Sequence, residues 1–388
     1  MKSVLPAPMP PGLPHDRYGD MAISFFHLMP IFFQSHLNLW EDFNMKKLLA
    51  VLLLLALALG LCTSALAVDE DIEGSVVIYT SMYPFMIDTM TAQLKEEFPN
   101  LDVNFFYGGT GDLQTKLAGE MGDDLKGRLS CDMLLVAEPA YSLELKEYGY
   151  LEPIVLDNAD ELLRFEYDPE GYWYPVRTLN MILAYNPDKY TLDELPTTFK
   201  AFAEDKSLSG KISMSNPLTS GTAMAAIVAL SDKYGYDYFT ALGENHVMIE
   251  SGSTALAKLQ TGECKVIMIL EESVLKIRKE EGSNISVIYP DDGVILVPST
   301  VMTIAENKSA NANIEACEAV TSWLLSEAGQ KCILSGYMHS VITSMDEYPY
   351  DSVSTDTLIE KDMGVDWERC YHDRDEIRTK FQEAVTLP

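Results

Sequence analysis

The chain has 388 residues and a formal net charge of −31 at pH 7, from 28 Lys and Arg against 59 Asp and Glu. Such an acidic surface argues against nucleic acid and anionic lipid headgroups as partners, because both would be repelled. Any anionic ligand must therefore be held by local dipoles and a few cations.

The N-terminal region predicts a secreted protein. Residues 45–67 combine Met45 and two lysines, an apolar run from Leu48 to Leu61, and Ala65-Leu-Ala67, which together are typical of a cleaved signal peptide. We expect cleavage after Ala67, leaving about 320 residues, enough for two domains. The alternative is a lipoprotein anchored through Cys62. In either case the protein is expected in the periplasm or at the cell surface.

Residues 1–44 precede the signal peptide, although a signal peptide works from the start of a chain. Trp40-Glu-Asp42 is encoded by TGG-GAR-GAY, which contains the ribosome-binding sequence GGAGG whenever Glu41 uses GAG. We therefore interpret residues 1–44 as a mis-assigned extension that is not translated, with translation starting at Met45.

Strands and helices alternate after the signal peptide. The runs 76–79, 102–107 and 131–136 predict strands, and the segments from Pro84 and from Asp112 to Met121 predict helices. This alternation is typical of a parallel sheet with helices on both faces, where ligands bind beyond the carboxyl ends of the strands. The residues at those ends, which we predict to bind a ligand, are Thr80, Ser81, Gly109, Thr110, Gly111 and Glu138.

The glycine-rich loop Gly108–Asp112 is the most informative of these strand ends. A strand, a glycine turn and a helix start together present free N–H groups at the positive end of a helix dipole, which favours an anion. The alternative is a tight turn with no ligand. A dinucleotide fingerprint is excluded, because Gln114 occupies the position of its third glycine.

A second α/β segment follows in the chain. Tyr172–Arg177 leads into a strand at 181–185, and a further strand begins at Ile212. Ser220-Gly221-Thr222 then precedes an alanine-rich helix, so these residues either cap that helix or form a second anion cradle. The buried strand 266–270 ends at Glu271-Glu272, which we add to the predicted ligand residues together with Arg177.

The remaining runs complete the predicted order of elements. Short strands at 285–289 and 293–298 indicate a return to the first domain, and helices are predicted at 314–325 and 366–381. The cysteines beyond the signal peptide, at 131, 264, 317, 332 and 370, are spaced too widely for a zinc site and are expected to be buried, with a Cys317–Cys332 bridge left open. The sequence offers no recognisable catalytic set, so we expect neither an enzyme nor a cofactor or resident metal.

The order of these motifs resembles the solute-binding proteins of ABC importers, in the branch that binds ferric iron, phosphonates, phosphosugars and thiamine. The matching segments are 77–81, 108–113, 145–153, 184–187, 215–222, Gly262-Glu263 and 323–330. The resemblance implies an α/β fold of two doubly wound lobes joined by a two-stranded hinge, the periplasmic-binding-protein fold of type II. It implies a first lobe at 74–180 plus 299–345, a second at 181–298, and a C-terminal helical segment at 346–388.

The resemblance also bears on the solute. Ferric binders of this branch carry adjacent tyrosines where Glu272-Ser273 stands here, and often a histidine near Ser81, and both features are missing. We therefore expect a small oxyanion solute, namely a phosphonate, a phosphorylated compound or a carboxylate, with Arg177 as a counter-charge. Ferric iron is the alternative solute. The implied partner is an ABC permease, the protein is expected to be a monomer, and a sensor subunit or an extracellular enzyme are the other classes considered.

The N-terminal interpretation predicts the mass of the native protein. Intact-mass analysis and N-terminal sequencing should find a chain that starts at Val68, because cleavage follows Ala67. A chain starting at a lipid-modified Cys62 would replace this outcome by the lipoprotein alternative. Any peptide from before Met45 would contradict the proposed start.

Overall fold

The structure, a computed structural model, describes residues 69–386. The predicted extension at 1–44, the signal peptide at 45–67 and Cys62 lie outside the described residues. Within residues 69–386, none of the helices combines the length and the apolar character that a membrane span requires.

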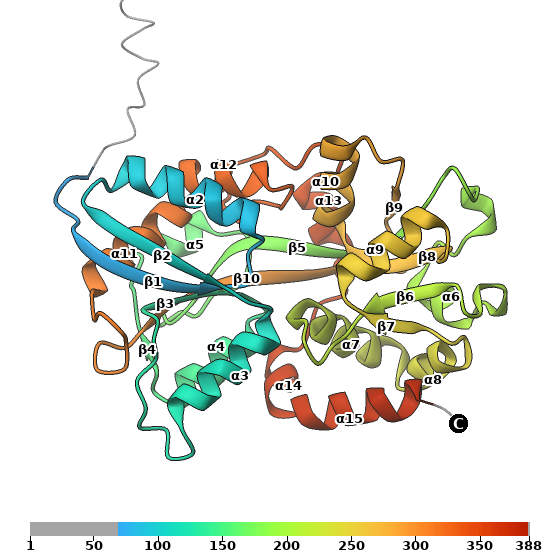
Figure 1. The fold of residues 1–388 in the computed structure, drawn as a ribbon, viewed down its shortest axis with the longest axis horizontal. Helices are drawn as coiled ribbons and strands as arrows, with labels where there is room; N and C mark the ends of the chain where they lie inside the picture. Colours follow the sequence, from blue (N-terminus) through green and yellow to red (C-terminus); the bar gives the residue numbers. More distant parts are fainter. Residues whose placement is uncertain (1–68, 387–388) are drawn as a thin grey trace, which may run out of the picture. The chain divides into compact units, whose positions relative to one another are not determined.

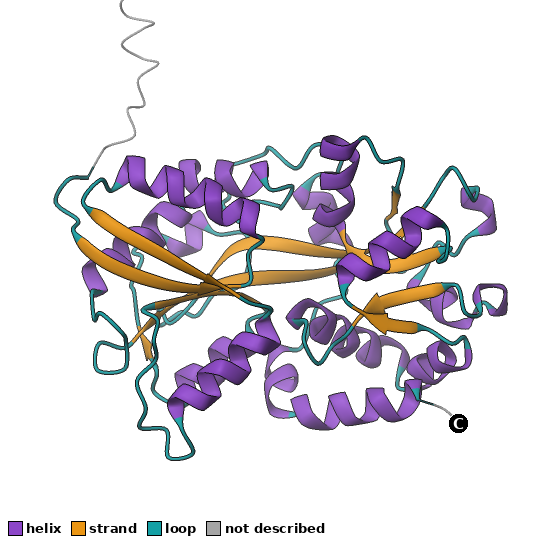
Figure 2. Cartoon of the chain, in the orientation of Figure 1, coloured by secondary structure: helices purple, strands orange, loops and turns teal. Residues whose placement is uncertain are grey.

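The described residues form a ten-stranded sheet with helices packed around it (Figures 1 and 2). The strands are β1 (Gly74–Thr80), β2 (Leu101–Tyr107), β3 (Met133–Ala137), β4 (Leu151–Glu152), β5 (Tyr174–Tyr185), β6 (Ile212–Ser215), β7 (Met248–Glu250), β8 (Val266–Leu270), β9 (Ser286–Ile288) and β10 (Ile295–Ile304). Their order is β2-β1-β3-β10-β5-β8-β6-β7, with β4 paired to β10 and β9 paired to β5.

The helices connect these strands along the chain. They are α2 (Pro84–Glu97), α3 (Thr110–Met121), α4 (Ala140–Glu147), α5 (Ala159–Leu162), α6 (Phe199–Glu204), α7 (Gly221–Tyr234), α8 (Asp237–Glu244), α9 (Gly252–Thr261), α10 (Glu271–Glu281), α11 (Ile314–Leu324), α12 (Glu327–Ser335), α13 (Thr355–Lys361), α14 (Trp367–His372) and α15 (Arg374–Val385).

Two parallel groups of strands lie at the two ends of the sheet. β1 pairs in parallel with β2 and β3, and β6 pairs in parallel with β7 and β8. We call β1–β3 with α2, α3, α4 and α11 the first lobe, and β6–β8 with α6–α10 the second lobe. Val76 and Ile78 of β1 pack in one core with α2, whereas Tyr79 packs in another core with α3. The two faces of β1 are therefore covered by different helices.

β5 and β10 run between the two lobes. β10 pairs with β3 through Ser299–Thr303, and β5 pairs with β8 through Met181–Tyr185. The two strands also pair antiparallel with each other, from Ile295 opposite Met181 to Ser299 opposite Arg177. The predicted fold class, two doubly wound α/β lobes joined by two strands, is therefore confirmed. The predicted lobe limits at 180/181 and 298/299 fall inside β5 and β10 and stay predictions.

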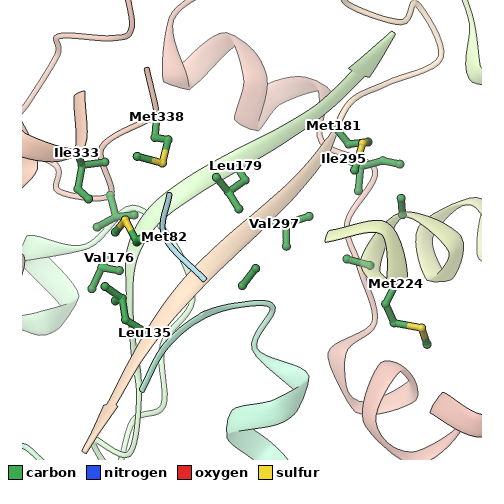
Figure 3. Close-up of a cluster of buried hydrophobic side chains, with 14 of the residues drawn as sticks. Met82, Leu135, Val176, Leu179, Met181, Met224, Ile295, Val297, Ile333 and Met338 are labelled. Carbon is green, nitrogen blue, oxygen red and sulfur yellow. The ribbon is translucent and has the colours of Figure 1, made fainter. Parts of the chain in front are cut away.

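One continuous apolar core follows these two strands. Figure 3 shows Leu179 and Met181 of β5 beside Ile295 and Val297 of β10, with methionines such as Met82 among the surrounding side chains. All residues of β10 are buried, as is typical of strands covered on both faces. The strands β5 and β10, which join the lobes, are thus part of the packed interior. Packing therefore fixes the positions of their side chains.

Two details differ from or refine the sequence predictions. The segment 366–381, predicted as a single helix, forms two helices. The break is at Asp373, whose φ of −101° and ψ of 11° are not helical, and which is both the C-cap of α14 and the N-cap of α15. The five cysteines beyond the signal peptide are buried free thiols, as expected of small apolar residues, and Cys317 and Cys332 are not bridged.

Candidate functional site

The starts of α3 and α7 meet in the structure. Gly109 is the N-cap of α3 and Ser220 is the N-cap of α7. The N–H of Gly111 donates to the carbonyl oxygen of Thr219 at 3.3 Å, and a Cβ on Gly111 would lie 2.7 Å from the Leu218 carbonyl oxygen. The two predicted loops are therefore in direct contact, and the close approach of their backbones requires glycine at position 111.

The end of β3 joins the same contact. A Cβ on Gly221 would lie 2.9 Å from Cγ of Glu138 and 3.1 Å from Cγ2 of Thr110. Glu138 is 1% exposed and has φ +76°, a left-handed backbone conformation that is uncommon outside glycine and tends to occur at functional sites. Residues from both lobes, distant in sequence, thus converge on Gly221.

The predicted hydroxyl groups have protein partners. Ser220 Oγ accepts from the N–H of Ala223 at 3.2 Å and lies 3.0 Å from Oγ1 of Thr222, so the capping role inferred from the sequence is present. Thr80 Oγ1 donates to the Leu135 carbonyl at 2.8 Å, and Ser81 Oγ accepts from the Ala137 N–H at 3.2 Å. These two hydroxyls therefore fasten the end of β1 to β3.

Arg177 lies on β5 and is 2% exposed. Its Nη1 donates to Sδ of Met338 at 2.7 Å, and its Nε has no hydrogen-bond partner within residues 69–386. A thioether is a weak acceptor, so this guanidinium lacks the oxygen acceptors that a buried cation normally requires. Burial lowers the pKa of Arg177, and the charge of Glu272 opposes that change.

Glu271 and Glu272 begin α10 but have opposite surroundings. Glu271 accepts from Asn180 Nδ2 at 3.0 Å and from the hydroxyls of Tyr289 and Ser352, and His339 Nε2 lies 3.3 Å from it. Burial alone would raise the pKa of Glu271, but the hydrogen bond and charge of His339, with the hydrogen bonds of Ser352 and Tyr289, hold that pKa below its ordinary value. The Glu271 carboxylate is therefore fully satisfied by the protein.

Glu272 is also buried, at 3% exposed, yet its Oε1 has no partner within the described residues. Burial raises its pKa to about 7, although the charge of Arg177 acts in the other direction. The charge of each group therefore acts on the pKa of the other, although no ion pair joins the two groups within residues 69–386. A buried guanidinium and a buried carboxyl group thus each keep one polar atom without a partner within the described residues.

Several residues of this region were missed by the sequence reasoning. The hydroxyl of half-buried Tyr83 lies 3.3 Å from Oγ of Ser273 on α10 and thereby links the two lobes, and Gln114 Nε2 donates to Glu138 Oε1 at 3.1 Å. Tyr83 stands two residues beyond Ser81 and could have been included with that strand end. Arg374, with Nη2 3.9 Å from Glu138 Oε1, gave no signal because its helix is remote in sequence.

The described residues offer no preformed metal centre. Within residues 69–386, no group of three or more His, Cys, Asp or Glu side chains is arranged to hold a metal ion. The groups brought together here are the guanidinium of Arg177, the carboxyl groups of Glu138 and Glu272, and the N-termini of α3 and α7.

The two adjacent glutamates predict opposite effects on stability. Because the folded pKa of Glu272 is raised to about 7 from 4.5, the folded state holds its proton more tightly, and the free energy of unfolding should fall as pH rises from about 4.5 to 7. Glu272→Gln should remove part of that fall and stabilise the solute-free protein at pH 8, by on the order of 2 kcal/mol. Urea unfolding at pH 5 and pH 8 measures both.

Glu271→Gln is the matched variant. The lowered pKa of Glu271 means that its carboxylate contributes stability above the ordinary carboxyl pKa, and that this contribution is lost as pH falls through the folded value. The variant should therefore unfold more easily at pH 8, by about 1–3 kcal/mol. Equal effects of the two substitutions would contradict the assignment of one satisfied and one unsatisfied carboxyl group.

Comparison with known proteins identifies the family of this chain. The chain is similar in structure to the periplasmic binding protein AfuA from Actinobacillus pleuropneumoniae with fructose-6-phosphate bound, at 20% identity and a TM-score of 0.70, covering 82% of this chain and 100% of that one. It is also similar to iron-bound HitA from Pseudomonas aeruginosa, at 19% identity and a TM-score of 0.69, covering 80% and 99%.

A periplasmic thiamin binding protein shares the fold at 14% identity and a TM-score of 0.67, covering 82% of this chain and 98% of that one. No curated protein matches the sequence significantly. The family model for the bacterial extracellular solute-binding protein matches residues 89–361, more than half of the chain. The chain therefore belongs to the bacterial extracellular solute-binding protein family, whose members are not enzymes but the substrate-binding components of ABC transporters.

Proposed function

We propose that this protein captures a small oxyanion solute between its two lobes and delivers it to the membrane permease of an ABC importer. The solute class is a phosphonate, a phosphorylated compound or a carboxylate. The observation that carries this proposal is the guanidinium of Arg177, which is buried on the strand shared by both lobes and has a thioether as its recorded partner. An oxyanion would supply the missing acceptors as charge-assisted hydrogen bonds.

The helix starts support the same class of solute. The N-termini of α3 and α7 carry positive partial charge and lie in contact through Gly111 and Thr219. Two like dipole ends repel each other, so an anion placed between them would stabilise the arrangement. The protein's overall negative charge does not prevent this, because fixed dipoles and Arg177 act at short range.

The proposed solute contacts follow from these positions. Direct contacts are assigned to strand ends, helix starts and the unpaired buried charges, with Glu271 as the support that holds the first turn of α10 beside them. The proposed direct set is Thr80, Ser81, Gly109, Thr110, Gly111, Arg177, Ser220, Gly221, Thr222 and Glu272. We add Tyr83 to this proposal, and we assign Glu138 a place beside the helix starts. We propose that the protein acts as a monomer whose lobes close on the solute.

Arg177→Met tests the central assignment. Methionine has a similar volume and no charge, so the solute-free protein should be as stable as wild type or more stable, because an unpaired buried cation is removed. Binding of the oxyanion should weaken by at least about tenfold, since one charge-assisted contact contributes roughly 1.5–3 kcal/mol. Urea unfolding and calorimetry give the two quantities.

Arg164→Met is the control for that variant. Arg164 donates to the carbonyl oxygens of Ile342 and Met345 and to Asp356, so its guanidinium is satisfied by the protein. This substitution should lower the free energy of unfolding and leave solute affinity unchanged. If Arg177→Met lowered the free energy of unfolding and left solute affinity unchanged, Arg177 would have a purely structural role and the assignment would be wrong.

A panel of compounds separates the proposed solute from the alternatives. Thermal shifts should be produced by at least one of inorganic phosphate, methylphosphonate, fructose 6-phosphate and citrate. A purified protein that is red, with a visible band lost on adding a chelator, would instead establish ferric iron as the solute. Permease and ATPase genes beside this gene would support import, and a neighbouring receptor gene alone would support a sensor subunit.

A further inference from the structure

The C-terminal helices α14 and α15 lie beyond residue 361, where the match to the family ends, yet they contact both lobes. α14 packs against α4 of the first lobe and α7 of the second, and α15 packs against α7 and α8 (Figure 1). On the second lobe, Phe381 meets Phe239 edge to face with ring centres 5.3 Å apart. The segment is therefore packed on both lobes through one face, which carries the buried residues Cys370, Ile377 and Phe381.

Polar contacts of this segment also reach both lobes. The hydroxyl of Tyr371 donates to Glu147 Oε2 at 2.7 Å, and Arg374 Nη1 donates to Glu144, both on α4. Arg369 donates to Ser231 Oγ at 3.0 Å and to Asp232, both on α7. The helices thus join the two lobes on a path separate from β5 and β10.

Arg374 additionally faces a residue of the proposed solute site. Its Nη2 lies 3.9 Å from Oε1 of Glu138, and neither that nitrogen nor Oε2 of Glu138 has a hydrogen-bond partner in the described chain. Glu138 in turn lies against Gly221, the first residue of α7. A buried carboxylate at this point would repel an anion held by the helix starts unless a cation offsets its charge.

We propose that Arg374 is a positioning residue of the solute site, which neutralises and holds Glu138 beside the starts of α3 and α7. The C-terminal helices therefore belong to the binding unit. This inference rests on the proposed function, because it requires a solute anion at those helix starts. Arg374 acts through Glu138 and is not assigned a contact with the solute.

The surroundings of Glu138 determine how this role depends on pH. Burial raises the pKa of Glu138 to about 7, and Arg374 opposes the rise. The other groups facing Glu138 are Tyr141 and Glu144 on α4, Cys370 on α14, Arg378 on α15 and the neutral Gln114 on α3. Among these neighbouring groups, Glu138 is therefore the one whose ionisation changes near neutral pH, as Glu272 does at the start of α10. Arg374 matters most above that pH, where the Glu138 carboxylate is charged.

The test is a double-mutant cycle with the full-length mature protein. Calorimetry with inorganic phosphate and with fructose 6-phosphate compares wild type, Arg374→Gln, Glu138→Gln and the double variant at pH 6 and pH 8.5. Arg374→Gln should weaken binding about tenfold at pH 8.5 and less at pH 6. Glu138→Gln should restore most of that loss, because no carboxylate then remains to be neutralised.

Lys380→Gln is the matched control, since it removes one positive charge from α15 at an exposed pair with Glu376. It should leave affinity unchanged. An Arg374→Gln protein with wild-type affinity, or a loss that Glu138→Gln does not restore, would overturn the positioning role alone. A wild-type protein that binds neither compound nor any other oxyanion would overturn the proposed function itself, and the positioning role with it.

Discussion

The structure depends on a buried charge that the protein itself does not pair. Arg177 lies on β5, a strand that belongs to the packed core and reaches both lobes. Taking a guanidinium out of water is costly unless oxygen acceptors replace the lost solvent, and the recorded partner here is a thioether. Glu272 is buried nearby, and its Oε1 has no hydrogen-bond donor within the described residues. The proposed solute would supply polar partners to both groups.

Glu271 contrasts with Glu272, because its buried carboxylate has hydrogen-bond partners. One residue earlier on the same helix, the Glu271 carboxylate accepts hydrogen bonds from Asn180, Tyr289 and Ser352 and lies beside His339. The chain is thus able to satisfy a buried charge completely where structure alone is at stake. Unsatisfied buried polar atoms in a native protein require an explanation, and the proposed solute would supply one for Arg177 and Glu272.

Close backbone approach is the second constraint on the site. Glycine at 111 and 221 lets two helix starts and the end of β3 come together, where any Cβ would collide with a carbonyl oxygen or with Glu138. This contact joins the lobes at one point, Tyr83 and Ser273 join them at another, and α14 and α15 at a third. The lobe closure that we propose would have to rearrange these contacts, so they would couple closure to binding.

The sequence by itself determined the class of fold and the strand ends at which polar residues gather. Alternating apolar runs and glycine turns are local signals, so the strands at 76–79 and 102–107 and the cap at Ser220 were readable from short segments. The helix predicted from Asp112 was also found, although it begins two residues earlier, at Thr110. Which carboxylate is satisfied was not readable, because the partners of Glu271 come from residues 180, 289, 339 and 352. Likewise, only tertiary packing brings Arg374 to Glu138 and leaves Arg177 without an oxygen acceptor, since burial and pairing depend on contacts between distant segments.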